Sequence, residues 1–126
     1  MDLKLILLDV DGVLTDGSIL VDGDGNETKR FNVKDGLAIK AAQSVGVPVG
    51  IISARHSRAT ARRARELDID IVEQASKDKA AAMRAIVKNM KIKPASVVFV
   101  GDDLADIGVM KAVGYPIAVA DAAEPV

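Results

Sequence analysis

The sequence predicts an α/β fold: a Rossmann-like, doubly wound and mostly parallel sheet. Short apolar runs alternate along the chain with segments of helical periodicity, which is the pattern of repeated β-α units. The apolar runs are continuous, as expected for strands that helices cover on both faces. Acidic or hydroxyl side chains follow several of these runs directly, which places them at the carboxyl ends of strands, where such sheets bind ligands.

The elements can be assigned in chain order. Buried strands are expected at residues 4–8, 47–52, 69–72, 97–100 and 117–119, and helices at 35–45, 57–67, 77–90 and 104–113. Ser57 is suited to cap the second helix, and Gly46 to end the first. The alternation is interrupted at residues 18–32, where two short segments flank Gly23-Asp-Gly-Asn26 and predict a β-hairpin inserted after the first strand.

Bulk composition limits the function classes. A chain of 126 residues with 49% hydrophobic content suits one domain, here residues 1–126, with one aliphatic core. The net charge of −1 and the 2% aromatic content argue against nucleic acid and membrane surfaces as partners. The absence of cysteine excludes disulfides and thiolate metal sites. No signal-like or membrane-spanning run is recognised, so a cytoplasmic location is expected.

The most informative motif is DVDGVLTDG at residues 9–17, directly after the first apolar run. Residues two apart on a strand point the same way, so the carboxylates of Asp9 and Asp11 are expected to face one site. Gly12 lets the backbone turn and approach a ligand closely. Two neighbouring carboxylates repel unless a cation or a shared proton relieves them, and a hard divalent cation such as Mg²⁺ takes oxygen ligands.

Three more strand ends carry or lead to reactive side chains. The second buried strand leads to Ser53 and then to Arg55, and the fourth leads to Asp102 and Asp103, with Asp106 one turn later. The third leads to Lys77 and Lys79. Carboxylates, a hydroxyl and an ammonium form a set suited to phosphoryl transfer, because carboxylates hold a metal or attack phosphorus while the other two groups neutralise the phosphoryl oxygens. Sequence chemistry alone leaves the choice between the two lysines open.

These motifs resemble those of the haloacid dehalogenase (HAD) superfamily of phosphatases. The four matching pieces are DVDGVLT at residues 9–15, Ile52-Ser53, Lys79, and Gly101-Asp-Asp-x-x-Asp106. Further pieces resemble the capless branch that contains 3-deoxy-D-manno-octulosonate 8-phosphate (KDO 8-phosphate) phosphatases: LTDG at 14–17, the hairpin, FNVKDG at 31–36, GDDL at 101–104 and AVAD at 118–121. The spacing of the motifs in this family favours Lys79 over Lys77.

The resemblance implies a HAD-like fold that has no cap domain, and it implies a catalytic role for each of several residues. Asp9 would be the nucleophile that forms an aspartyl-phosphate, and Asp11 would protonate the leaving oxygen and then activate water. Ser53 and Lys79 would hold the phosphoryl group. Mg²⁺ would bind the carboxylates of Asp9 and Asp102 and the backbone carbonyl of Asp11.

The resemblance also implies supporting roles. Asp103 and Asp106 would orient metal-bound water or the phosphate-binding lysine, and Gly12 would allow the substrate to approach. Lys34 and Arg55 would contact the carboxylate or hydroxyls of a small phosphorylated sugar acid, with KDO 8-phosphate expected and sialic acid 9-phosphate as the alternative. The hairpin would cover the site and help to assemble a homotetramer.

The sequence departs from this branch in three places. Ser53-Ala-Arg55 replaces a usual Thr-Gly-Arg or Ser-Gly-Arg, and Lys34 stands where arginine is common, which removes bidentate recognition of a carboxylate. Relatives also continue beyond the segment at 118–121 into a glycine-rich tail that reaches an active site, whereas this sequence ends at Val126. The expectation of phosphatase chemistry therefore has more support than that of one substrate.

Two other function classes fit parts of the pattern. A signalling receiver module combines an acidic pair, a phospho-accepting Asp and a Lys in a chain of this length, but it needs its acceptor Asp after the third strand, where this sequence has Glu73-Gln74. A non-catalytic assembly module is the other alternative.

Overall fold

The predicted fold class is confirmed by the architecture. The structure, a computed structural model, describes residues 2–119. Its main sheet has the strand order β5-β4-β1-β6-β7, and all four pairings are parallel. These strands are β1 (Leu5–Leu8), β4 (Val49–Ile52), β5 (Ile71–Glu73), β6 (Val97–Gly101) and β7 (Tyr115–Ala118).

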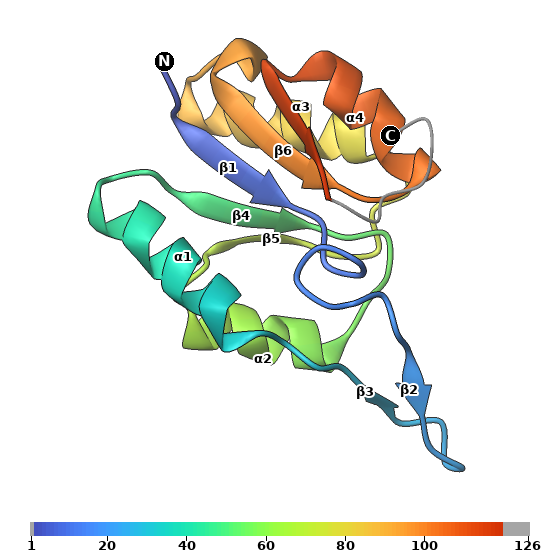
Figure 1. The fold of residues 1–126 in the computed structure, drawn as a ribbon. Coiled ribbons are helices and arrows are strands. Elements are labelled where there is room, and N and C mark those ends of the chain that lie inside the picture. The colour runs from blue at the N-terminus through green and yellow to red at the C-terminus, as the bar shows by residue number, and fades with distance from the viewer. Residues whose placement is uncertain (1, 120–126) are drawn as a thin grey trace.

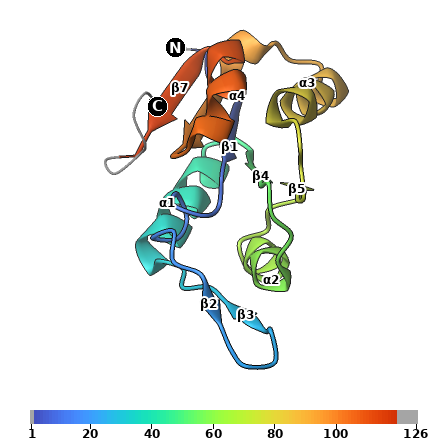
Figure 2. The same ribbon diagram turned by 90° about the vertical axis from the view of Figure 1, so that its right-hand side faces the viewer.

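Helices cover both faces of this sheet (Figures 1 and 2). The helices are α1 (Val33–Ser44), α2 (Arg58–Glu66), α3 (Lys79–Met90) and α4 (Ile107–Ala112), with short 3₁₀ turns η1 (Pro94–Ser96) and η2 (Leu104–Asp106). Within β1, Leu8 packs into a core with α1 and α2, while Leu5 and Leu7 pack into a second core with α3 and α4. Alternate side chains of one strand thus supply two cores, and the strand reads as a continuous apolar run.

The predicted hairpin is present but short. It consists of β2 (Leu20–Val21) and β3 (Glu27–Thr28), paired antiparallel. It follows β1 in the chain and projects away from the main sheet beyond α2 (Figure 1). At its tip, the Asp22 carboxylate accepts hydrogen bonds from the backbone N–H groups of Asp24 and Asn26, at 2.9 Å each, which closes the turn.

Two boundaries differ from the sequence prediction. The last strand begins at Tyr115 and includes Pro116, whereas the apolar pattern predicted residues 117–119. Proline is tolerated there because β7 is an edge strand that pairs only with β6. The helix predicted at 104–113 is divided into η2 and α4, because the carboxylates of Asp103 and Asp106 cap the first turn. Of the segment at 118–121, the last two residues lie outside the described part of the chain.

The strand order of the main sheet differs from that of signalling receivers. Numbered along the chain, the five parallel strands stand in the order 3-2-1-4-5. Signalling receivers have the flavodoxin-like order 2-1-3-4-5 instead. The structure therefore does not have the topology of a receiver module, and the order reverses between β1 and β6.

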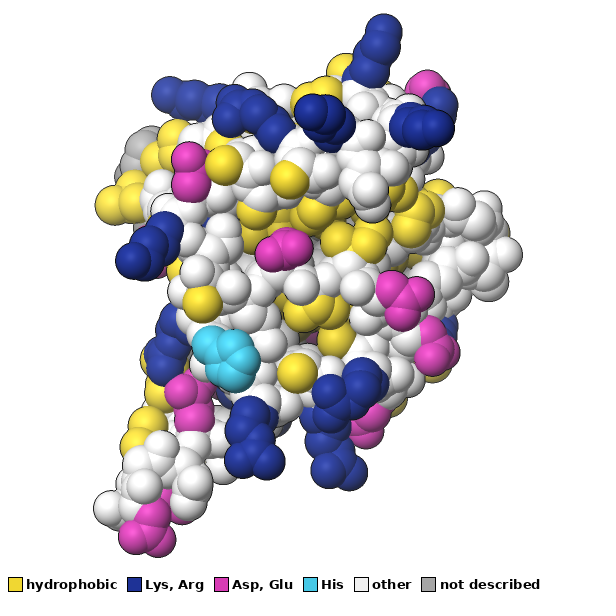
Figure 3. All heavy atoms as spheres, turned by 180° about the vertical axis from the view of Figure 1, so that it is seen from behind, with side chains coloured by type: hydrophobic (Ala, Val, Ile, Leu, Met, Phe, Trp, Pro, Cys, Tyr) yellow, Lys and Arg dark blue, Asp and Glu magenta, His cyan; other side chains and the backbone are white. Residues whose placement is uncertain are grey.

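Basic, acidic and hydrophobic side chains all occur on the surface. On the face shown in Figure 3, basic side chains gather in two separate groups with hydrophobic and acidic side chains between them. Within residues 2–119, no helix combines the length and the apolar character that crossing a bilayer requires.

Candidate active site

The candidate site lies where the strand order reverses, at the carboxyl ends of β1 and β6. Asp9 follows β1 directly, and Asp102 follows β6 directly. The two strands are neighbours in register, with Leu8 beside Val100, so their ends bring the two aspartates to one edge of the sheet. On the other side of β1, Ser53 follows β4 directly. Open parallel sheets bind ligands at such a reversal, because the loops there diverge.

A buried lysine bridges two carboxylates at this edge. The Nζ atom of Lys79 lies 2.5 Å from Oδ1 of Asp106 and 3.2 Å from Oδ2 of Asp9. Lys79 is the first residue of α3, and Asp106 is fully buried at the end of η2. The other oxygen of Asp106 accepts hydrogen bonds from the backbone N–H groups of Asp102, at 3.0 Å, and Asp103, at 3.3 Å. Asp106 therefore fixes both the lysine and the loop after β6.

The protonation of this cluster is shifted by its environment. Burial raises the pKa of Asp9 from 3.8 to about 7, against the opposing effect of the nearby Lys79 ammonium. Burial also raises the pKa of Asp102. Burial lowers the pKa of Lys79, but the negative charges of Asp9 and Asp106 outweigh it, and the pKa is raised overall. The lysine is therefore a fixed cation, but its charge does not offset the effect of burial on the pKa of Asp9 or of Asp102.

The donor set fits a hard divalent cation. One carboxylate oxygen from each of Asp9, Asp102 and Asp106 lies within 4.8 Å of the others, a spacing compatible with a shared ion. Asp106 is already occupied by Lys79 and by backbone donors. Asp9, which shares one oxygen with Lys79, and Asp102 are thus the carboxylates with oxygens left for a metal. Burial raises the pKa of both by disfavouring the charged form, and a bound cation would stabilise that charged form.

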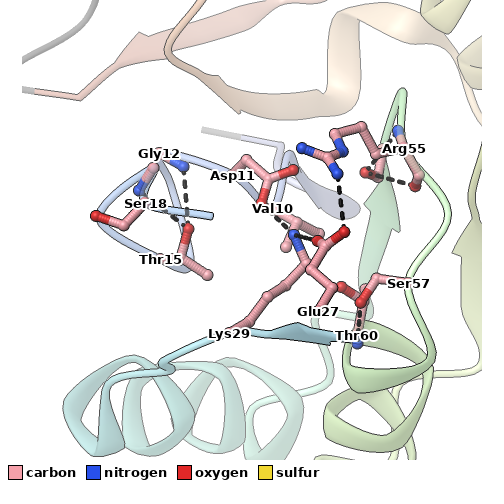
Figure 4. Close-up of polar contacts among 12 residues, drawn as sticks. Val10, Asp11, Gly12, Thr15, Ser18, Glu27, Lys29, Arg55, Ser57 and Thr60 are labelled. Carbon is pink, nitrogen blue, oxygen red and sulfur yellow. Dashed lines mark hydrogen bonds and ion pairs between the residues drawn. The ribbon is translucent and has the colours of Figure 1, made fainter. Parts of the chain in front are cut away.

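The loop after β1 is held against Asp102 by a glycine. Gly12 has φ +87°, and a Cβ atom added to it would lie 1.7 Å from Oδ2 of Asp102. No other residue fits there without displacing the carboxylate. The Oγ1 atom of Thr15 accepts hydrogen bonds from the backbone N–H groups of Gly12, at 3.3 Å, and Gly17, at 3.1 Å (Figure 4). Thr15 thereby fixes a tight loop beside the metal-binding candidates.

The Ser53 side chain is buried and forms a local turn. Its Oγ atom accepts a hydrogen bond from the backbone N–H of Arg55, at 3.3 Å, and donates one to the carbonyl oxygen of Arg55, at 3.1 Å. The hydroxyl thus has a defined position at the end of β4. The Arg55 guanidinium reaches the hairpin and lies 2.8 Å from Oε2 of Glu27.

The hairpin contributes a residue that the sequence analysis missed. The ammonium of Lys29 contacts Oδ1 of Asp11 and lies 3.0 Å from Oε1 of Glu27 (Figure 4). The Lys29 side chain is 1% exposed. The sequence pattern placed Lys29 in the second half of the predicted hairpin and gave it no role. The available signal was the spacing of Glu27 and Lys29, which are two apart and therefore share one face of the strand.

Three other predicted residues lie outside this cluster. Lys77 is exposed, so Lys79 is the lysine that contacts Asp9. The Asp103 side chain is exposed and caps η2, where it accepts a hydrogen bond from the backbone N–H of Leu104 at 2.7 Å. Lys34 is exposed in the first turn of α1 and lines a separate cavity of about 700 Å³ with Thr15 and other residues of the two loops.

Comparison with known proteins gives consistent matches. A model of the haloacid dehalogenase-like hydrolase family matches residues 30–114. The chain is 40% identical over 121 residues to the 3-deoxy-D-manno-octulosonate 8-phosphate phosphatase KdsC of Escherichia coli strain K12, and this match covers 96% of the chain and 64% of that protein. The chain thus spans somewhat less than two thirds of the length of this relative.

Solved structures agree in fold over almost the whole chain. The crystal structure of 3-deoxy-D-manno-octulosonate 8-phosphate phosphatase from Moraxella catarrhalis, in complex with magnesium, phosphate and KDO, matches with a TM-score of 0.95 and 37% identity, covering 98% of this chain and 71% of that one. The cobalt-bound deoxy-D-mannose-octulosonate 8-phosphate phosphatase of Haemophilus influenzae matches with a TM-score of 0.93 and 34% identity, covering 97% and 71%.

Proposed function

The chain belongs to the haloacid dehalogenase-like hydrolase family, and we propose that it is a Mg²⁺-dependent phosphomonoesterase for a small phosphorylated sugar acid. The observation that carries this proposal is the cluster of Asp9, Lys79, Asp102 and Asp106 at the reversal of the strand order. It combines a buried carboxylate, a fixed ammonium and a pair of carboxylates free for a metal. These are the parts that transfer of a phosphoryl group requires.

The residues divide the reaction into two steps. An oxygen of Asp9 attacks phosphorus, the bond from phosphorus to the sugar oxygen breaks, and Asp11 gives its proton to that oxygen. Water then attacks the phosphorus of the aspartyl-phosphate, Asp11 takes a proton from the water, and phosphate leaves Asp9. Lys79 and Ser53 hold the phosphoryl oxygens through both steps.

A magnesium ion would be held by the carboxylates of Asp9 and Asp102 and by the backbone carbonyl of Asp11. Such an ion neutralises negative charge on the phosphoryl group and on the carboxylates, which would otherwise repel the dianionic substrate. Asp106 holds Lys79 and the loop after β6, and Gly12 leaves the space in which Asp102 lies.

KDO 8-phosphate is the substrate that we propose. Support comes from the relatives, whose names specify this substrate, and from the KDO and phosphate in the Moraxella catarrhalis complex. Lys34 and Arg55 are the proposed contacts for the sugar acid, since both carry exposed positive charge near the loops that surround the site. Sialic acid 9-phosphate shares the carboxylate and the terminal phosphate and is the alternative.

We further propose that the protein forms a homotetramer through its hairpin. Ile19, Leu20 and Val21 are 44%, 50% and 61% exposed on the hairpin, and Val33 and Leu37 are exposed on α1. Exposed apolar side chains that lie close in sequence are typical of protein interfaces. Light scattering of the purified protein measures the mass directly, and a monomer would contradict this part of the proposal.

The activity is tested by phosphate release from KDO 8-phosphate, sialic acid 9-phosphate and 4-nitrophenyl phosphate, with Mg²⁺ and with EDTA. We expect Mg²⁺-dependent release with preference for KDO 8-phosphate, and no release by Asp9→Asn, which keeps the size of the side chain but removes the nucleophile. Similar release from all three substrates would refute the substrate assignment. No release from any of them would refute the phosphatase assignment itself.

A further inference from the structure

We propose that Lys29 is a positioning residue that orients Asp11 for proton transfer, and that Glu27 and Arg55 hold Lys29 in place. This inference rests on the proposed phosphatase function and adds to it Lys29 and Glu27 from the hairpin, together with a second role for Arg55 in the turn after β4. The four side chains form a row of alternating charge from Asp11 through Lys29 and Glu27 to Arg55 (Figure 4).

The contacts of Lys29 are specific to one oxygen of Asp11. The ammonium contacts Oδ1, which leaves Oδ2 as the oxygen that exchanges a proton with the substrate or with water. An aspartate side chain rotates about two bonds, and an ion pair with a buried partner removes that freedom. The Asp11 side chain is 23% exposed, so its carboxylate is reachable from solvent while Lys29 is not.

Because Lys29 is buried, it can position Asp11 but cannot bind the substrate. The Lys29 side chain is 1% exposed, and a substrate has no access to an ammonium that the hairpin covers. The chain accommodates a buried cation because two carboxylates surround it, from Asp11 and Glu27. The second oxygen of Glu27 lies 2.8 Å from the Arg55 guanidinium, so Glu27 is held from both sides.

The arrangement gives the hairpin a part in the chemistry. When Asp11 gives its proton to the leaving sugar oxygen, a negative charge forms on its carboxylate next to the Lys29 ammonium. The charge is stabilised in place, without movement of either group. When Asp11 then takes a proton from the attacking water, the carboxylate is neutral again and the cycle is closed. Lys29 gives up no proton and forms no bond at any point.

The test compares two leaving groups in Lys29→Met. An alkyl phosphate such as KDO 8-phosphate needs protonation of the leaving oxygen, whereas 4-nitrophenolate leaves without it. The kcat/KM value reports the steps up to formation of the aspartyl-phosphate, so the ratio of kcat/KM for the two substrates isolates proton donation. We expect this ratio to fall at least about tenfold in Lys29→Met, as part of the 10²- to 10⁴-fold contribution of general acids.

A matched control is the neighbouring Arg30→Met. It removes the same charge from the same hairpin, but Arg30 is exposed and lies outside the row of charges. We expect its ratio to equal that of the wild type. An unchanged ratio in Lys29→Met, or an equal loss on both substrates, would overturn the role of Lys29 while the phosphatase assignment stands. A wild type that releases phosphate from neither substrate would overturn both.

A chemical rescue covers the case in which Lys29→Met does not fold. The chain has no cysteine, so Lys29→Cys carries one thiol that 2-bromoethylamine alkylates in denaturant, with loss of bromide. The product is a lysine analogue with sulfur in the side chain. After refolding, we expect the alkylated protein to regain the wild-type ratio. Recovery of the fold without recovery of the ratio would contradict the proposal.

Discussion

The contact between Gly12 and Asp102 gives a prediction that two variants of one loop can separate. Gly12 and Gly17 both have positive φ, at +87° and +88°. An alanine Cβ at position 12 would lie 1.7 Å from Oδ2 of Asp102, whereas at position 17 the nearest atom is 3.8 Å away. Gly12→Ala therefore combines backbone strain with displacement of a carboxylate, and Gly17→Ala has the strain alone.

The magnitudes follow from the geometry. A left-handed conformation costs alanine about 1–2 kcal/mol, so both variants should lose roughly this much free energy of unfolding. In Gly12→Ala, the 1.7 Å contact is about 1.3 Å shorter than a closest approach of 3.0 Å, so the carboxylate must move by about that distance. Misplacement of a functional group by about 1 Å lowers the rate about 100-fold. We expect that loss in kcat/KM for Gly12→Ala and a loss within about threefold for Gly17→Ala.

Two assays check the reasoning. Urea unfolding in EDTA measures the strain, and the shift in thermal unfolding on adding Mg²⁺ measures metal binding. Gly17→Ala should keep the wild-type Mg²⁺ shift, while Gly12→Ala should lose most of it. If both variants respond to Mg²⁺ like the wild type, Asp102 tolerates displacement and is not a metal ligand. If both lose the response equally, the strained loop matters and the carboxylate contact does not.

The remaining predictions concern the charged cluster. Asp106→Asn leaves the buried Lys79 with one partner in place of two, so the free energy of unfolding should fall by about 3 kcal/mol in urea titrations. Lys40→Met breaks the exposed pair with Asp68 and should change it by less than about 1 kcal/mol, and equal losses would contradict the buried role of Asp106. Because the pKa of Asp9 is raised from 3.8 to about 7, the metal-free folded protein holds a proton that the unfolded chain releases at lower pH. Its stability should therefore fall as the pH rises from about 4 to about 7, and thermal unfolding in EDTA should show that Asp9→Asn has lost this part of the slope.

The position of the cluster could be predicted from sequence because its aspartates directly follow strands that the sequence pattern identifies. Asp9 and Asp102 each follow a continuous apolar run, and the carboxyl ends of parallel strands meet at one edge whatever the loops do. Sequence chemistry alone did not reveal which lysine reaches Asp9, although the motif spacing of the resembling family favoured Lys79. The cap residue Asp78 decides this: its side chain accepts a hydrogen bond from the backbone N–H of Ala81, so α3 begins at Lys79 and leaves Lys77 outside.

The contribution of the hairpin could not be predicted, because it depends on tertiary docking. Lys29 lies in a charged segment that resembles any solvated hairpin strand, and only the path of the chain after β1 brings it over Asp11. Arg55 was expected at the substrate, and its guanidinium also binds Glu27, a contact between segments far apart in sequence. Ion pairs between distant segments leave no periodic pattern, whereas buried strands do.

The place of β1 in the sheet has a consequence for how the molecule folds. Among the described strands, β1 comes first along the chain but lies at the centre of the main sheet, and its neighbour β6 follows only after β4 and β5. Pairings of such high contact order form slowly, because a long loop must close before they give any stability. The proposed nucleophile Asp9 therefore meets its proposed metal-binding partner Asp102 only after β4 and β5 have been made, and we expect Mg²⁺ to act only once β1 and β6 are paired. Refolding experiments should accordingly show Mg²⁺ slowing the unfolding reaction far more than it accelerates folding.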